Sequence, residues 1–256
     1  MKIVLNMPED AYHGTPAVSQ SLLKQIARSE AHGKAWLDGI REEPTPAMML
    51  GRAIHAAILE PARFADRYVV IEGDRRTAVV KAQLAAAQEA GQMVLRPDEY
   101  ETCIGMAGAC REHATVAALL GNGGNAEVSV FWDDDGLPCK ARADWVSADG
   151  ATLVDIKSTD DASPAAFTRA IYRYGYAMQD AHYRIGFRAE DMVFVAVEKE
   201  PPHAIGVYRI APEWRGMATE RRSVLMAKWM SAVEFGRYPA YPLEIVNLEA
   251  PAWADE

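Results

Sequence analysis

Cysteine is scarce in this chain, and long apolar runs are missing. The three cysteines, Cys103, Cys110 and Cys139, are an odd number at spacings that match no zinc or iron–sulfur pattern, which argues against a disulfide framework. The apolar runs fall far short of the roughly 20 residues that a membrane span requires. The first residues run into Pro8-Glu9-Asp10, too early for a secretory signal. We therefore expect a soluble protein of the reduced cytoplasm.

Positive charge is also in deficit. The 256 residues include 27 lysines and arginines against 36 aspartates and glutamates, which gives a net charge of −9. This balance excludes a uniformly basic surface for nucleic acid, although a hydrolytic metal site would itself gather carboxylates. Half of the residues are apolar, which excludes wholesale disorder. The length allows one large domain or two small ones, and we predict a single domain over 1–256.

Helical patterns dominate the first part of the chain, about 15–120. The first predicted helix is capped at Ser19 or Ser21 and runs to about Gly39. Its end leads into a loop over 42–46, where prolines exclude a continuous helix. Further helices are predicted over 47–60, 77–93 and 97–120.

Strand patterns begin at about residue 121 and mark a core that extends to about residue 240. β-Branched and aromatic residues separated by turns predict a meander with strands over 126–132, 139–146 and 152–158. Ser163-Pro164 begins a long helix that runs to about Arg188. The remaining predicted elements are a strand over 191–199, a strand ending at Ile210 and a helix over 212–235. This order predicts one α/β domain with a helical N-terminal part.

Two carboxylates and a lysine are expected to meet in the meander. Asp155 and Lys157 are two residues apart in a strand, so their side chains share a face that Ile156 does not. The turn at Asp149-Gly150 folds the chain so that Asp144 lies near Asp155. Carboxylate oxygens suit Mg²⁺, and a lysine beside the metal can orient or deprotonate a bound water. A surface ion pair is the alternative, but the apolar residues before Asp155 favour an interior site.

The sequence resembles a known group of enzymes at these residues. Asp144 followed by Asp155-Ile156-Lys157 resembles the PD-(D/E)XK nuclease signature, with Ala143 at the variable position where the signature's name has proline. Further motifs in matching order resemble RecB-like nucleases and, among them, RecE-type exodeoxyribonuclease VIII. These motifs are Gly51-Arg52-Ala53-Ile54-His55 with Leu59-Glu60-Pro61, the pair Gln179 and Tyr183, and Ser19 to Lys24 followed by Ser29-Glu30-Ala31-His32. The resemblance covers roughly residues 15–240 and implies a restriction-endonuclease-like core, a mixed central sheet flanked by helices.

The resemblance also implies a role for each motif residue. Lys157 activates or steers the attacking water, while Gln179 and Tyr183, on one helical face, orient that water and the scissile phosphate. The family has an acidic residue near Glu127, which we predict to be catalytic by supporting the metal or its water shell. The metal is Mg²⁺ or Mn²⁺. Its implied ligands are His55, Asp144, Asp155 and the backbone carbonyl of Ile156.

Ordinary structural explanations exist for the same residues. His55 lies in an apolar run, where a lone histidine is usually a core residue. Gln179 and Tyr183 fit a polar stripe on an amphipathic helix, and Glu127 fits the edge of a strand. Basic residues in the helical segments are either phosphate contacts or part of a solvated helix face. The predicted DNA contacts are Arg75, Arg76, Arg169 and Arg173.

The function that the resemblance implies is an exodeoxyribonuclease acting on linear double-stranded DNA, 5′ to 3′, in phage-type recombination and repair. Its implied partners are a single-strand annealing protein and further copies of the chain in a ring-like homo-oligomer, such as a tetramer. A structure-specific endonuclease of the same fold and a non-catalytic DNA-binding protein are the alternatives. An iron–sulfur relative of this fold needs four cysteine ligands, and the sequence has three cysteines.

Overall fold

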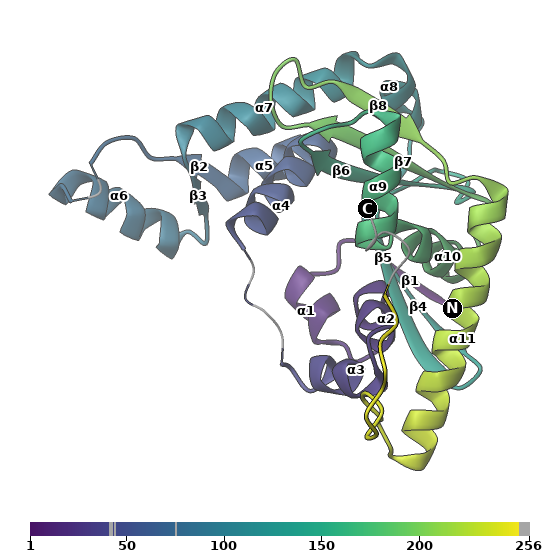
Figure 1. The fold of residues 1–256 in the computed structure, drawn as a ribbon. Coiled ribbons are helices and arrows are strands. Elements are labelled where there is room, and N and C mark those ends of the chain that lie inside the picture. The colour runs from purple at the N-terminus through teal and green to yellow at the C-terminus, as the bar shows by residue number, and fades with distance from the viewer. Residues whose placement is uncertain (41–42, 44, 75, 251–256) are drawn as a thin grey trace.

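A mixed six-stranded sheet forms the centre of the computed structural model, which describes residues 1–40, 43, 45–74 and 76–250 (Figure 1). Its strands are β1 Lys2–Val4, β4 Asn125–Asp134, β5 Leu137–Val146, β6 Thr152–Thr159, β7 Asp191–Glu198 and β8 Ile205–Tyr208. They lie in the order β1-β4-β5-β6-β7-β8, and only β6 and β7 are parallel neighbours. The predicted fold class, α/β with a mixed central sheet flanked by helices, is confirmed.

Helices cover both faces of this sheet. Their bounds are α1 Glu9–Gly14, α2 Gln20–Ile26, α3 Glu30–Leu37, α4 Pro46–Leu59, α5 Pro61–Arg67, α6 Ala78–Glu89, α7 Pro97–Glu112, α8 Ala114–Gly121, α9 Pro164–Tyr174, α10 Tyr176–Phe187 and α11 Pro212–Phe235. On one face, Phe167 of α9 packs with Phe194 of β7. On the other, Ile54 of α4 and Met106 of α7 pack with Ile156 of β6. Within the described ranges, no helix combines the length and apolar character needed to cross a membrane.

The first predicted helix, Ser19 to about Gly39, is two helices in the structure. Ser19 caps α2 as predicted, because its hydroxyl accepts a hydrogen bond from the backbone amide of Leu22 at 3.3 Å. The chain then breaks, since Ser29 adopts an extended conformation and caps α3 by accepting from the amide of His32 at 3.2 Å. A second serine cap inside an apolar helical pattern thus divides the helix.

The other long helical predictions are divided as well. The helix predicted over 97–120 is interrupted at His113, whose extended backbone begins α8. The helix predicted from Ser163 to about Arg188 is interrupted at Gly175, which adopts a left-handed φ of +71° that glycine tolerates readily. This turn gives α10 its own direction across the sheet (Figure 1).

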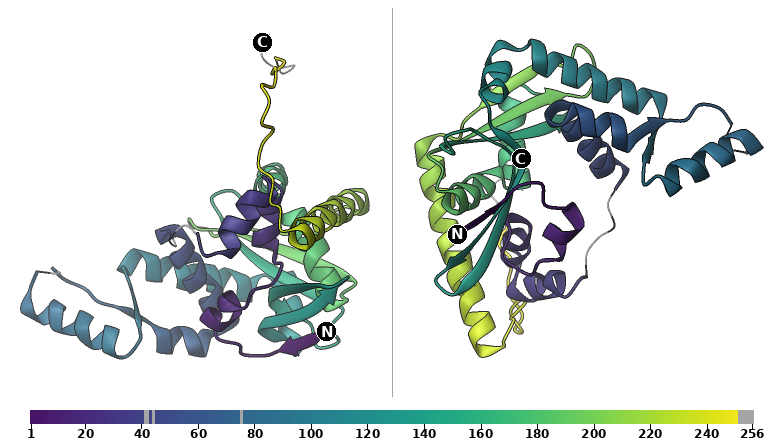
Figure 2. Two further views of the ribbon diagram at one scale, coloured as in Figure 1. Left: turned by 90° about the horizontal axis from the view of Figure 1, so that it is seen from below. Right: turned by 180° about the vertical axis from the view of Figure 1, so that it is seen from behind.

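A small arm projects from the body beside α5 and α7 (Figures 1 and 2). It contains α6 and two parallel strands, β2 Tyr68–Val70 and β3 Met93–Leu95. The helix predicted over 77–93 therefore ends early, and its last residue begins β3. Neither strand was predicted, because three residues are too few to display an alternating pattern. The three-residue strand β1 was not predicted for the same reason, and the helices α1 and α5 were not predicted because six or seven residues make too few turns to show a helical period.

His182 of α10 is fully buried and holds three parts of the fold together. Its Nε2 lies 3.1 Å from the carbonyl oxygen of Lys140 in β5 and 3.2 Å from that of Val18 before α2. Arg222 of α11 donates from Nε to His182 Nδ1 at 3.0 Å. The imidazole is therefore the neutral tautomer with its proton on Nε2. Burial, followed by the charge of Arg222, lowers the pKa of His182 to about 3.

We predict that His182→Gln weakens the dependence of the free energy of unfolding on pH between about pH 3 and 6.5. The unfolded chain protonates this imidazole below its ordinary pKa of 6.5, whereas the folded protein resists protonation down to about pH 3. Stability is therefore lost as pH falls through that window, by about 1.4 kcal/mol per pH unit for this one proton. Glutamine keeps a donor and an acceptor without titrating. Urea unfolding at pH 4 to 6 measures the slope, and equal slopes for wild type and variant would contradict the prediction.

A second prediction concerns the close approach of α10 to the sheet. A Cβ atom added to Gly186 would lie 2.4 Å from the indole ring of Trp132, so Gly186→Ala should destabilise the fold by about 1–3 kcal/mol. Gly216 in α11 is the matched control, because its added Cβ meets nothing within 4 Å. Gly216→Ala should stabilise the fold by about 0.5–1 kcal/mol. Chemical denaturation measures the free energy of unfolding of both variants. A change of the same sign in both would contradict the prediction.

Candidate metal centre

The site begins where β5 and β6 separate. These neighbouring strands pair at two positions, the second of which joins Trp145 to Val154. Beyond this pair, a side chain takes the place of the β5 backbone as the hydrogen-bond acceptor for β6. The backbone N–H of Ile156 donates to Asp144 Oδ2 at 2.7 Å. A buried amide is thereby satisfied by a charged side chain, which is fixed in place at the end of the ladder.

Asp155 and Lys157 lie on the α10 face of β6, as their spacing predicted. Asp155 is 2% exposed, and its Oδ2 accepts a hydrogen bond from Gln179 Nε2 at 2.5 Å. Its Oδ1 forms an ion pair with Lys157 Nζ, which also lies 4.5 Å from the ring centroid of Tyr176. The side chain of Ile156 points to the opposite face, into the core beneath α4 and α7. The Asp155–Lys157 pair is therefore an interior pair, not a surface one.

Burial and neighbouring charges shift the pKa values of both side chains of this pair. Burial and the nearby carboxylate of Asp144 raise the pKa of Asp155 to about 6, against the opposing effect of Lys157. Burial favours the neutral amine of Lys157, but the charges of Asp155, Tyr176 and Asp144 and the hydrogen bond to Asp155 together outweigh it and raise the pKa of the lysine. Lys157 is consequently a cation at neutral pH, held beside two carboxylates.

Glu127 of β4 sits opposite Asp144 with an unusual backbone. The β4–β5 register pairs Ala126 with Trp145 and Val128 with Ala143, and the intervening Glu127 has a φ of +53°. A left-handed conformation at a non-glycine residue costs about 1–3 kcal/mol and is concentrated at functional sites. Burial, then the charge of Asp144, raises the pKa of Glu127.

Arg142 is the nearest counter-charge to Glu127. Its Nε donates to Glu127 Oε2 at 2.6 Å, and its NH1 donates to the carbonyl oxygen of Met7 at 2.9 Å. This arginine was not predicted as a site residue. Its position two residues before Asp144 in the same strand was the available signal, since such residues share a face.

His55 reaches the acidic group from α4. Its Nδ1 lies 3.3 Å from Asp144 Oδ2. Burial favours the neutral imidazole, but the charge of Asp144 and its hydrogen bond to the ring outweigh it and raise the pKa of His55 to about 9. One potential ligand atom from each of His55, Glu127 and Asp144 lies within 4.8 Å of the others. Three separate elements thus bring a nitrogen donor and two carboxylates to one point.

The donor set fits a hard divalent cation. Glu127, Asp144 and the adjoining Asp155 provide carboxylate oxygens, and the imidazole of His55 suits Mn²⁺ as well as Mg²⁺. Asp155 Oδ1 is buried and accepts no hydrogen bond within the described part of the chain, although it contacts Lys157. Glu127 therefore joins His55 and Asp144 in the closest group, while Asp155 lies beside it and is engaged by Lys157 and Gln179.

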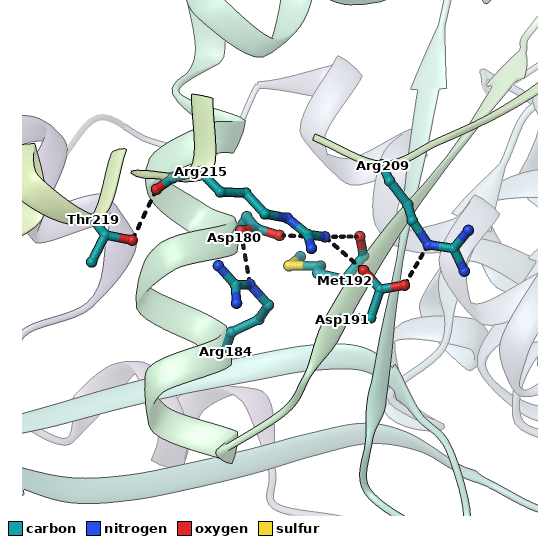
Figure 3. A network of polar contacts seen from close by, with 7 residues as sticks. All are labelled: Asp180, Arg184, Asp191, Met192, Arg209, Arg215 and Thr219. Carbon is teal, nitrogen blue, oxygen red and sulfur yellow. Dashed lines mark hydrogen bonds and ion pairs between the residues drawn. The ribbon is translucent and has the colours of Figure 1, made fainter. Parts of the chain in front are cut away.

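Gln179, which donates to Asp155, lies on helix α10 next to a network of charged side chains around the buried Asp180 (Figure 3). Asp180, next in the chain and fully buried, accepts from Arg184 Nε at 2.9 Å and lies 3.4 Å from a guanidinium nitrogen of Arg215. Arg215 also donates to Asp191 at the start of β7 at 2.6 Å. The network ties α10 to α11 and to the sheet. None of its arginines was predicted as a site residue. Arg184 lies only one helical turn from Asp180, but the pairs that Arg215 and Arg209 form join distant parts of the sequence.

The other predicted residues lie further from the metal group. Tyr183 is one turn beyond Gln179 and packs in the core between α10 and the sheet, where burial raises its pKa well above the usual range. Arg169 and Arg173 are exposed on α9, and Arg76 is exposed in the arm near Asp74. Arg75 lies outside the described residues. In the part of the chain that the structure covers, no ion pair joins these arginines to the acidic group.

Known proteins are similar to this chain in sequence family and in fold. A model of the family described as "PDDEXK-like domain of unknown function (DUF3799)" matches residues 19–241. No curated protein sequence matches the chain. Among solved structures, the chain is similar to a candidate exonuclease from Eubacterium rectale, with 14% identity, 98% of each chain covered and a TM-score of 0.66. This likeness shows a shared fold.

Two further solved structures are more distantly similar. A phage-related exonuclease from Haemophilus somnus is 12% identical over 86% of this chain and 96% of its own, with a TM-score of 0.38. An alkaline exonuclease from Laribacter hongkongensis is 14% identical over 72% of this chain and 95% of its own, with a TM-score of 0.34. Because the family model spans α4, the strands β4 to β7 and α10, the chain belongs to the PDDEXK-like DUF3799 family and has the α/β fold of PD-(D/E)XK nucleases.

Proposed function

We propose that this protein is a metal-dependent nuclease that hydrolyses phosphodiester bonds of DNA. The observation that carries the proposal is the convergence of His55, Glu127 and Asp144 beside a buried Asp155–Lys157 pair. Three carboxylates, Glu127, Asp144 and Asp155, face Lys157, Arg142 and the imidazole of His55, whose pKa is raised to about 9. A divalent cation would take the place of the proton on His55, and the donors around it are the oxygens and the nitrogen that such an ion binds.

Each side chain has a distinct role in the proposed reaction. His55, Glu127, Asp144 and Asp155, with the carbonyl of Ile156, would hold Mg²⁺ or Mn²⁺. The bound metal supplies a Lewis acid that stabilises negative charge on phosphate and lowers the pKa of a water. Lys157 is a buried cation that orients the attacking water and stabilises negative charge on a phosphate oxygen. Gln179 fixes Asp155 by its hydrogen bond. Tyr183, whose raised pKa keeps its phenol protonated, would orient the water and the phosphate from the same helix.

The substrate that we propose is linear double-stranded DNA, degraded from 5′ to 3′ during phage-type recombination and repair. Support comes from the likeness of Ser19 to Lys24 to RecE-type enzymes, and from that of His55 and the Gln179–Tyr183 pair to the wider RecB-like group. Exposed Arg169, Arg173 and Arg76 are the phosphate contacts in this proposal. A ring-like homo-oligomer and an annealing partner belong to the same proposal.

The metal group makes a prediction that does not depend on cleavage. Glu127→Gln and Asp144→Asn should each weaken Mn²⁺ binding at least about tenfold, because each removes an anionic oxygen donor. Isothermal titration calorimetry of the purified protein with MnCl₂ measures the affinity. Glu190→Gln, at an exposed glutamate before β7, is the matched control and should keep the wild-type affinity. Wild-type affinity in both site variants would place the metal elsewhere.

Cleavage provides the direct test of the reaction. Lys157→Met and Asp155→Asn should reduce the rate on linear duplex DNA by about 10²–10⁴-fold with Mg²⁺ or Mn²⁺, while DNA binding by fluorescence anisotropy is largely kept. Lys199→Met removes a lysine that pairs with Asp160 away from the site and should leave the rate unchanged. Full turnover in either site variant would refute the mechanism.

The form of the substrate separates the alternatives. Loss of linear DNA from labelled 5′ ends, with circular duplex intact, is expected for the proposed exonuclease. Release of nucleotides from 3′ ends would show that the enzyme degrades DNA from 3′ to 5′. Nicking of circular duplex would identify an endonuclease of the same fold. Intact DNA of every form, despite binding, would identify a non-catalytic DNA-binding protein.

A further inference from the structure

The residues between β1 and α2 contact the elements that carry the metal group. This N-terminal segment, residues 5–16, includes the short helix α1. Oε1 of Glu9, the first residue of α1, lies 2.9 Å from NH2 of Arg52 in α4. Arg52 is one helical turn before His55, so the ion pair joins the segment to the helix that supplies the nitrogen donor of the metal group.

A buried lysine holds the same segment on β5. Lys140 Nζ donates to the carbonyl oxygens of Tyr12 and Thr15, each at 2.7 Å, and lies 4.6 Å from the ring centroid of Tyr12. Helix α1 has six residues, too few to be stable alone, so its position depends on these contacts. The segment therefore lies between α4 and β5, which hold two of the three residues of the metal group (Figure 1).

Arg142 connects the segment to the third residue of the metal group. Its guanidinium lies between two acceptors, because NH1 donates to the carbonyl oxygen of Met7 at 2.9 Å and Nε donates to Glu127 Oε2 at 2.6 Å. The side chains of Arg142 and Glu127 are 17% and 22% exposed, so water has little access to this pair. A planar guanidinium fixes the directions of both hydrogen bonds together. A shift of Met7 would therefore turn the carboxylate of Glu127.

Two effects of Arg142 on a bound metal have opposite signs. A cation beside the site repels a metal ion, so the charge of Arg142 by itself weakens metal binding. Its hydrogen bond to Glu127 strengthens binding, since outer hydrogen bonds that orient a ligand are worth about 10–100-fold in metal affinity. Glu127 has a left-handed backbone with a φ of +53°, so the direction of its carboxylate depends on this contact more than on the strand. We expect orientation to outweigh repulsion.

We propose that the N-terminal segment is a working part of the metal centre and that Arg142 is the positioning residue that couples the two. Arg142, anchored at the carbonyl of Met7, holds Glu127 in place as a ligand, while the Glu9–Arg52 pair holds α4 from the same segment. Coupling of this kind is reciprocal, so a bound metal stabilises the docked segment in turn. The inference rests on the metal site of the proposed function, but not on cleavage of DNA.

Calorimetric titration of the full chain with MnCl₂ tests the role of Arg142. Arg142→Gln should bind Mn²⁺ about 10–100-fold more weakly than the wild type, whereas loss of a merely repelling charge would tighten binding. Arg142→Gln/Glu127→Gln should bind no more weakly than Glu127→Gln alone, because the arginine acts through that carboxylate. Arg96→Gln is the matched control, since Arg96 also pairs with a glutamate, Glu99 of α7 at 3.1 Å, and it should keep the wild-type affinity.

Amide hydrogen exchange of the wild type tests the reverse direction without any variant. Saturating Mn²⁺ should slow exchange in the N-terminal segment at least about threefold, including the Tyr12 amide that donates to the Pro8 carbonyl, and should leave the amides of α6 in the arm unchanged. Glu127→Gln should lose this slowing.

The outcomes separate this inference from the proposed function. Wild-type or tighter Mn²⁺ binding by Arg142→Gln, beside weakened binding by Glu127→Gln, would overturn the coupling and leave the metal site intact. Exchange rates in the segment that do not respond to Mn²⁺, in a wild type that binds the ion, would do the same. A wild type that binds no Mn²⁺ would overturn both.

Discussion

The hydrogen bond from the Ile156 amide to the Asp144 carboxylate is the contact on which the site depends. A buried amide at the end of a ladder needs an acceptor, and here that acceptor is a charged side chain instead of a backbone carbonyl. The bond therefore holds the carboxylate at the point where β5 and β6 separate. His55 and Glu127 then converge on this one fixed oxygen donor from a helix and from the next strand.

Without a bound cation, the convergence of these carboxylates lowers the stability of the fold. The pKa of Glu127 is raised and that of Asp155 is about 6, because burial and mutual repulsion disfavour both charged forms. The left-handed backbone of Glu127 adds conformational strain. Arg142, Lys157 and the protonated imidazole of His55 offset the negative charge. A fold keeps such a costly arrangement where its donors bind something, and a divalent cation that replaces the proton on His55 is the ligand that these donors suit.

The surrounding fold makes the arrangement rigid. Helix α10 is held at one side by the charges of Asp180, Arg215 and Asp191 (Figure 3) and at the other by the neutral imidazole of His182. Gln179 lies between these anchors, so its hydrogen bond to Asp155 is set by the packing of the whole helix. The close approach of α10 to the sheet depends on the missing side chain of Gly186.

Local sequence determined the elements whose signals are contained in a few neighbouring residues. Alternation along β6 predicted that Asp155 and Lys157 share a face, and the hydroxyl of Ser19 predicted the start of α2, because both effects act within one strand or one helical turn. The helix breaks at Ser29, His113 and Gly175 were missed, since competing caps and a left-handed glycine override an apolar pattern. Only the tertiary structure decided that Glu127 joins His55 and Asp144, that Arg142 faces Glu127, and that Arg215 anchors α10. These contacts join residues far apart in the chain, and their geometry comes from long-range packing that no local pattern encodes.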